Sequence, residues 1–362
     1  MQLYIHNKFM GHKSMKAAIK KNWTGFKAGV KAQYPGRDSN LKCEYIEGKF
    51  SDNGTLPFVL PIKNYIQSYN FADAVVVIES YLNKRVFSAQ GQPLFSLAAK
   101  ELEASFDDEN ESIEQNERLL AHYSDWHASR PDCPYAAAAY AHGLQVTGHS
   151  HRGTDWAHKV KPHQWQAMQA YNEKAQSIYD ATRNNFQNHW YWTKNYFRFA
   201  LVSGVQAPEI WRRFEKCVAT NAYDYEIYDT MAFMMMPRWH GSFEDIEKVA
   251  QIAAQATQQH CGDMLYARVI SSLYDFHFLP ELQFDWSRLK KGFQDWLNLF
   301  PSDYTKTYFA CSAYAMGEYK LTLELLESLD EFYIEAWDAD EDIYLANSIC
   351  REFKKNYPSQ IT

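Results

Sequence analysis

Hydrophobic residues recur at helical spacing through most of this 362-residue chain. From Pro61 onward, apolar side chains three and four residues apart alternate with short polar breaks, and this pattern predicts one helix after another. Two segments, Trp126 to Gly148 and Trp296 to Gly317, share a layout of tryptophan, proline and an Ala/Tyr-rich helix that is expected to end near the glycine. Small residues let neighbouring helices approach closely. The sequence therefore predicts an all-α fold, a tetratricopeptide-like α-α superhelix of degenerate helix pairs.

The clearest boundary between two predicted helices lies within residues 234–243. Pro237 removes a backbone donor and ends the preceding helix. Gly241 is expected to take a positive φ in the turn that follows. Ser242 is a good N-cap, and Asp245 three residues later completes a weak capping box. The segment thus predicts a helix, a tight turn and a second helix.

The same segment resembles the Pro-Arg-Trp-Gly-Gly-Ser signature of a bacterial family, domain-of-unknown-function family 4034. His240 stands where that family usually has Gly, and the matching positions are Pro237, Arg238, Trp239, Gly241 and Ser242. The pair Arg152-Gly153 resembles the family's Arg-Gly turn, and the resemblance covers residues 60 to 330. It implies tetratricopeptide-like helical repeats in a bacterial protein and implies no particular activity.

Residues 1–60 differ from the rest and are predicted to form an N-terminal extension, with residues 61–362 as the helical-repeat domain. Five apolar residues interleaved with six lysines between residues 13 and 31 predict a basic amphipathic helix. Binding of this helix to RNA or to a membrane surface is the functional alternative to a solvated face. Short apolar runs on either side of Asn53-Gly54 predict a β-hairpin within residues 43–60.

The composition indicates which kinds of partner and which cellular compartment suit this protein. The net charge of −7 disfavours nucleic acid as a partner and is complementary to a basic protein. Six cysteines are scattered without a Cys-x-x-Cys pair, which is typical of a reduced cytoplasmic protein. Neither a signal peptide nor an uncharged apolar run of ~18 residues is present in the sequence. We therefore expect a cytoplasmic protein that does not bind a membrane.

Candidate chemistry centres on a run of histidines that could supply imidazole ligands to zinc. The five are His142, His149, His151, His158 and His163. No cysteine or carboxylate completes an established ligand pattern around them, and the predicted Arg-Gly turn explains polar residues there equally well. Motifs for a serine nucleophile, a phosphate-binding loop or a dinucleotide site are also missing from the sequence. We predict no catalytic residue, no metal and no cofactor, with a metal-dependent hydrolase using the His149–His163 region as an alternative.

Candidate partner-binding residues come from aromatic, basic and acidic clusters. Because three consecutive residues of a helix point in different directions, at least one aromatic ring of residues 190–192 is expected to face away from the core. Arg238 and Trp239, in the turn between the two predicted helices, either face a groove or maintain the geometry of the turn. The acidic residues between 338 and 342 either begin a helix or bind a basic partner. The candidates are Trp190, Tyr191, Trp192, Tyr225, Arg238, Trp239, Asp338, Asp340, Glu341 and Asp342.

These features together predict a non-enzymatic protein-binding protein of the bacterial cytoplasm. Helical repeats build extended surfaces, and the acidic balance suits a basic partner. The specific prediction is an immunity protein of the antitoxin type, which binds and neutralises a cognate toxin or effector. A scaffold or assembly factor is the alternative within the same class.

Overall fold

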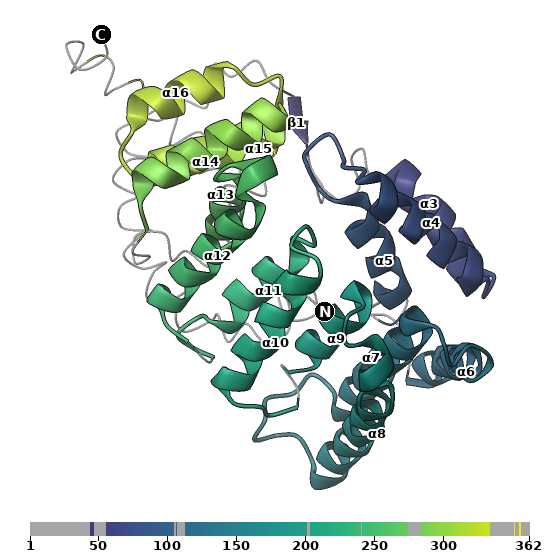
Figure 1. Cartoon of the computed structure of the whole chain (residues 1–362). Coiled ribbons are helices and arrows are strands. Elements are labelled where there is room, and N and C mark those ends of the chain that lie inside the picture. The colour runs from purple at the N-terminus through teal and green to yellow at the C-terminus, as the bar shows by residue number, and fades with distance from the viewer. Residues whose placement is uncertain are drawn as a thin grey trace. The chain divides into compact units, whose positions relative to one another are not determined.

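The computed structural model describes residues 44–46, 56–104, 106, 113–200, 203–239, 241–273, 284–333, 351 and 355. The described part contains fourteen helices and two three-residue strands, so the predicted all-α fold is confirmed (Figure 1). Contacts divide the chain into two compact units. The long unit spans residues 48–305, and the short unit combines residues 1–47 with residues 306–362.

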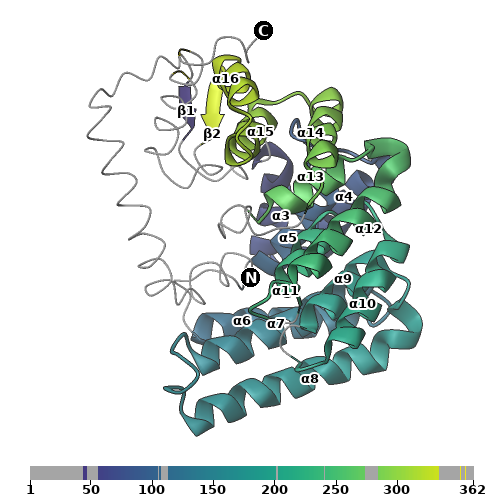
Figure 2. The same ribbon diagram turned by 90° about the vertical axis from the view of Figure 1, so that its left-hand side faces the viewer.

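The long unit is a succession of helices that pack on their sequence neighbours (Figure 2). These are α3 (Leu56–Gln67), α4 (Phe71–Lys84), α5 (Leu94–Ala104), α6 (Ile113–Ser129), α7 (Pro134–Arg152), α8 (Pro162–Phe186), α9 (Trp190–Phe199), α10 (Ala207–Thr220), α11 (Glu226–Met234), α12 (Phe243–Cys261), α13 (Met264–Ser271) and α14 (Trp286–Leu299). First neighbours such as α6 with α7 are in contact, and so are second neighbours such as α7 with α9. This is the packing of a stack of helix pairs, as the sequence predicts. None of the described helices is long and apolar enough to cross a bilayer.

The short unit contains the two strands and the last helices. Its elements are β1 (Glu44–Ile46), most of α15 (Asp303–Ala315), α16 (Tyr319–Glu327) and β2 (Glu331–Tyr333). The strands pair in parallel, with Tyr45 opposite Phe332. Parallel strands need a crossover connection, and here the connection includes the whole long unit.

This pairing corrects the predicted hairpin and changes the division of the chain. Residues 44–46 pair with a strand near the C-terminus, and the apolar run from Leu56 is the start of α3 rather than a strand. Pro57 suits a first helical turn, where its missing N–H is not needed. The division into units therefore differs from the predicted boundary at residue 60. The basic segment 13–31 lies outside the described residues.

The predicted boundary between two helices within residues 234–243 is confirmed, but Gly241 is needed there for a different reason than predicted. Helix α11 ends before Pro237, and α12 begins with Ser242 as N-cap. The Asp245 N–H donates to Ser242 Oγ at 3.2 Å, and the Ser242 N–H donates to Asp245 Oδ2 at 3.0 Å, which is the predicted capping box. The φ of Gly241 is not positive. Glycine is required there because an added Cβ would lie 2.7 Å from the Met235 carbonyl oxygen.

Gly148 in α7 also differs from the prediction, because it serves close helix packing rather than a helix end. Helix α7 does not end near Gly148 but continues to Arg152. A Cβ on Gly148 would lie 2.8 Å from Tyr171 Cβ, so this glycine allows α8 to approach α7 closely. Gly153 follows as the C-cap with φ 76°, and the Arg152 guanidinium stacks over the Trp165 ring at 4.9 Å. The Arg-Gly pair is therefore the end of a helix.

A contact between distant segments joins the two ends of the long unit. The Trp296 indole N–H, in α14, donates to the Gln90 carbonyl oxygen at 3.0 Å. Gln90 lies in the loop between α4 and α5. In the same loop, a Cβ on Gly91 (φ 80°) would overlap the Phe300 ring. The stack therefore returns to its own beginning rather than remaining open.

Helix α9 is the centre of the long unit. All ten of its residues are buried, and α7, α8 and α10 pack around it. Six of the ten are aromatic, and large rings fill the irregular spaces between crossing helices. The remaining four are polar, and three of them belong to a network of buried charges and amides described below.

Candidate functional site

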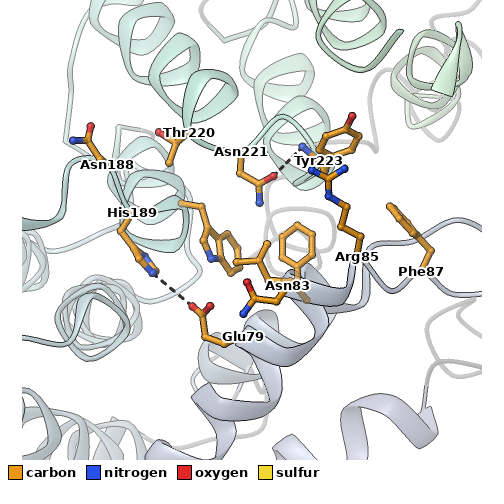
Figure 3. A pocket seen from close by; sticks show the side chains of 12 residues that line it. Glu79, Asn83, Arg85, Phe87, Asn188, His189, Thr220, Asn221 and Tyr223 are labelled. Atoms are coloured by element: carbon orange, nitrogen blue, oxygen red, sulfur yellow. Dashed lines mark hydrogen bonds and ion pairs between the residues drawn. The ribbon is translucent and has the colours of Figure 1, made fainter. Parts of the chain in front are cut away.

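The long unit contains a cleft of about 550 Å³ where the ends of several helices meet (Figure 3). We call it the helix-end cleft. Its wall is formed by the last turn of α4, the start of α5, the start of α9 and the end of α10 with the turn that follows. The lining residues are Glu79, Leu82, Asn83, Arg85, Phe87, Phe95, Asn188, His189, Trp190, Thr220, Asn221 and Tyr223. Aromatic walls with a few convergent polar groups are typical of ligand sites.

Three polar residues of the cleft are caps of helices. Arg85 is the C-cap of α4 and has the left-handed conformation, with φ 48° and ψ 54°. His189 is the N-cap of α9, and Asn221 is the C-cap of α10. Asn221 Oδ1 accepts a hydrogen bond from the Tyr223 N–H at 3.1 Å, which forms an Asx turn. Three helix termini thus bring polar groups to one place.

An acid and a histidine face each other on one side of the cleft. Glu79 Oε1 accepts a hydrogen bond from Tyr135 OH at 2.7 Å and lies 3.8 Å from His189 Nε2 (Figure 3). The neighbouring His189 lowers the pKa of Glu79, and the Tyr135 hydrogen bond adds to this against the opposite effect of burial. Glu79 is therefore a carboxylate at neutral pH whose contacts are already made.

Several other polar groups of the cleft have no hydrogen-bond or ion-pair partner among the described residues. Asn221 Nδ2 and His189 Nδ1 are buried atoms without a hydrogen-bond partner there. The Asn83 side chain is exposed and makes no hydrogen bond to the described residues. The Arg85 guanidinium lies 5.5 Å from the Tyr223 ring, and no carboxylate of the described residues is within 4 Å of it. The cleft therefore has more unused donors than unused acceptors.

Near the cleft, where Lys194 Nζ lies 5.9 Å from the ring of the lining residue Trp190, buried charges tie three helices together. We call Glu103, Lys194, Arg198 and Glu226 the buried charge cluster. Lys194 Nζ lies 3.1 Å from Glu226 Oε2 and 3.5 Å from Glu103 Oε1, and Arg198 donates to Glu103 Oε2. Asn195 Nδ2 also donates to Glu103 Oε1, at 3.2 Å. These contacts join α5, α9 and α11 in the region that supports the cleft.

The cluster controls the ionisation of its own carboxyl groups. Burial alone would raise the pKa of Glu103, but the positive charges of Arg198 and Lys194 outweigh it and hold that pKa below its usual range. Asp224 is also buried, and burial raises its pKa to about 6 against the opposite effect of the Lys194 charge. Asp224 Oδ1 accepts from Ser96 Oγ at 2.7 Å, and its second oxygen has no partner among the described residues.

The structure corrects the predicted exposure of the aromatic residues 190–192. Trp190, Tyr191 and Trp192 are 6%, 0% and 1% exposed, so the expectation that one ring faces away from the core is wrong. The reason is that α9 packs among α7, α8 and α10, and its charged residues Lys194 and Arg198 pair with buried carboxylates. Tyr225 is also buried, with its hydroxyl 3.6 Å from Cys261 Sγ. Trp190 alone among these residues lines the cleft.

The remaining candidates lie elsewhere. Trp239 is 39% exposed, and the Arg238 guanidinium is 5.5 Å from its ring, on a turn outside the cleft lining. Asp338, Asp340, Glu341 and Asp342 lie outside the described residues.

The histidine run does not converge in the part of the chain that the structure describes. No group of three or more His, Cys, Asp or Glu there could hold a metal ion. His151 Nε2 lies 3.1 Å from Glu117 Oε1 on the surface of α7. His149 is half-buried, and burial together with the charge of Arg152 lowers its pKa to about 4.

Sequence reasoning missed the cleft because its polar residues look like ordinary helix ends. Glu79 and Asn83 lie in the second half of α4 and Arg85 is its C-cap, while His189 and Asn221 flank other helices. Asparagine and histidine at such positions are explained locally by capping. Nothing local indicates that these termini meet.

Comparison with known proteins gives no match to a family model, a curated protein or a solved structure. The resemblance to family 4034 stays a prediction.

Proposed function

We propose that the chain is a non-enzymatic protein-binding helical-repeat protein and that the helix-end cleft is its recognition site. The observation that carries the proposal is the buried Asn221 Nδ2 donor without an acceptor among the described residues, beside the exposed side chains of Asn83 and Arg85 and aromatic walls. An unpaired buried donor costs free energy that a bound acceptor recovers. The buried charge cluster joins α5 and α9, which both contribute lining residues to the cleft, and a rigid support reduces the ordering cost of binding.

The more specific proposal is an immunity protein that captures a cognate toxin in the bacterial cytoplasm. Its support is the net charge of −7, since many proteins that attack nucleic acid are basic and long-range attraction speeds capture. A scaffold or assembly factor would use the same cleft without neutralising its partner.

A steric block of the cleft tests the binding function without assuming the chemistry of the partner. Asn83→Trp places a large ring in the cleft lining, whereas Lys84→Trp adds the same ring one residue away, outside the lining. Both positions are exposed, so we expect both variants to fold. In affinity capture from the native cell at physiological salt, a partner should be retained by the unmodified chain and by Lys84→Trp, and lost with Asn83→Trp.

The immunity function is tested by growth. Expression of the captured partner alone should arrest cells, and co-expression of the chain, but not of its Asn83→Trp variant, should restore growth. Capture of the same proteins by all three forms would contradict the assignment of the cleft. A captured partner that is harmless when expressed alone would favour the scaffold instead.

A further inference from the structure

We infer that the helix-end cleft binds a carboxylate group of a peptide segment, with Arg85 and Asn221 as its donors. The inference rests on the proposed function, because it names the chemistry that the same cleft recognises. The carboxylate could belong to an Asp or Glu side chain or to the C-terminus of the partner. Even a basic protein has such groups, so the inference is compatible with an acidic chain that attracts a basic partner.

The first observation is the position of Arg85. Of the described residues that line the cleft, it is the one lysine or arginine. Its guanidinium lies near the Tyr223 ring, and no carboxylate of the described residues pairs with it. Its backbone is in the left-handed region, which L-amino acids other than Gly and Asn rarely adopt. This left-handed helix end places the exposed Arg85 side chain in the lining of the cleft.

The second observation is the orientation of the Asn221 amide. Its oxygen is occupied by the Tyr223 N–H, so the nitrogen must be the atom on the other side. This nitrogen is buried and has no acceptor among the described residues. Figure 3 shows it directed away from Tyr223 and toward the interior of the cleft. An acceptor supplied by a ligand would satisfy a donor that the fold leaves unpaired.

The balance of charge selects a carboxylate rather than a phosphate. Phosphate groups are bound by clusters of arginine, and this cleft has one. Glu79 is a carboxylate in the same lining, and it would repel a dianion more strongly than a single negative charge. Glu79 itself does not neutralise Arg85, since its contacts are with Tyr135 and His189.

The amide groups of the lining favour a peptide as the carrier of this carboxylate. Asn83, Asn188 and Asn221 stand around the cleft, and each amide offers both donor and acceptor atoms. Asn188 Oδ1 accepts from Lys216 Nζ at 2.6 Å, which leaves its nitrogen available for a carbonyl. A peptide backbone has the complementary alternation of N–H and C=O groups.

The test uses three pools of N-acetylated random hexapeptides with the immobilised full-length chain. The first pool has a free C-terminus and no Asp or Glu, the second has an amidated C-terminus and one Asp or Glu, and the third has neither carboxylate. Mass spectrometry measures the retained fraction of each pool. We expect retention of the first pool, the second or both, which identifies the source of the carboxylate, and no retention of the third.

Three variants assign the retention to the cleft. Arg85→Gln removes the cation, and Asn221→Asp keeps the oxygen of the Asx turn but replaces the donor by a negative charge. Each should reduce retention of the carboxylate pools by roughly tenfold or more, since hydrogen bonds to charged groups contribute most. The control Lys84→Gln removes an equal charge one residue outside the lining and should leave retention unchanged. Circular dichroism verifies folding, and Arg85→Gly, which suits the left-handed backbone, replaces Arg85→Gln if that variant is unstable.

The outcomes separate this inference from the proposed function. Equal retention of all three pools overturns the carboxylate inference and leaves peptide binding intact. Undiminished retention of the carboxylate pools by Arg85→Gln and Asn221→Asp overturns it as well, as does retention of no pool. The proposed function is decided by the steric block at Asn83, which does not depend on any of these results.

Discussion

Replacing Glu103 with Gln should destabilise the long unit more than any exposed charge change. Glu103 is fully buried between two cations, and Gln keeps the shape and the acceptor for Asn195 while removing the charge. Lys194 would keep Glu226 at 3.1 Å, whereas Arg198 would lose the charged partner to which it donates and would lie 4.0 Å from the Glu226 carboxylate. Removing one partner of a buried pair costs about 3–5 kcal/mol because the other charge stays buried.

The assay is urea denaturation at pH 7, followed by tryptophan fluorescence and circular dichroism. A loss of about 4 kcal/mol is a large part of the roughly 5–15 kcal/mol that stabilises a domain. Asp180→Asn is the control, because it breaks a surface pair with Arg183 at 2.8 Å whose side chains are 41% and 56% exposed. Such pairs contribute about 0–1 kcal/mol.

A double variant distinguishes the loss of the Glu103–Arg198 ion pair from a general packing defect. Arg198→Met in the Glu103→Gln background removes the cation of that pair and leaves Lys194 paired with Glu226. The double variant should lose less stability than the sum of the two single variants. If Glu103→Gln costs no more than Asp180→Asn, or if the two single costs simply add, the electrostatic reasoning is refuted.

Three further predictions concern other features. Asp224 has a folded pKa of about 6 against an ordinary 3.8, so the folded chain holds a proton that the unfolded chain releases, and stability falls as pH rises through this window. Asp224→Asn should therefore gain up to about 3 kcal/mol at pH 8 and much less at pH 4 in urea titrations; an equal effect at both pH values would contradict this. Arg85→Gly should raise stability by about 0.5–1 kcal/mol by relieving the left-handed backbone, while peptide retention falls. Gly292→Ala should cost about 1–3 kcal/mol in the same assay, because its Cβ would overlap the Asp263 carbonyl oxygen; an unchanged midpoint would show that α14 can shift.

Local signals allowed the helices to be predicted, whereas the site depends on contacts between distant segments. Ser242 with Asp245 is a capping pattern within four residues, and the structure has it. The polar residues of α9 look like a solvated face in the sequence. They are buried because Glu103 and Glu226, on other helices, compensate Lys194 and Arg198. No periodicity within one helix could have shown that pairing.

The helix-end cleft was missed for a related reason. A left-handed helix end is usually marked by glycine, and Arg85 gives no such signal. The hairpin was predicted from a turn sequence at Asn53-Gly54, but the strand at 44–46 found its partner at the other end of the chain. Pairing over such a separation is not encoded in any short window of sequence.

The hydrogen bond from Trp296 to Gln90 has a consequence for how such a protein can form and diversify. Open solenoids tolerate gain or loss of a whole repeat, because each repeat depends only on those beside it. Here an inserted or deleted helix pair would displace α14 from the loop that it holds. During synthesis, that loop emerges from the ribosome long before its tryptophan partner does. Its final conformation must therefore await almost the entire long unit.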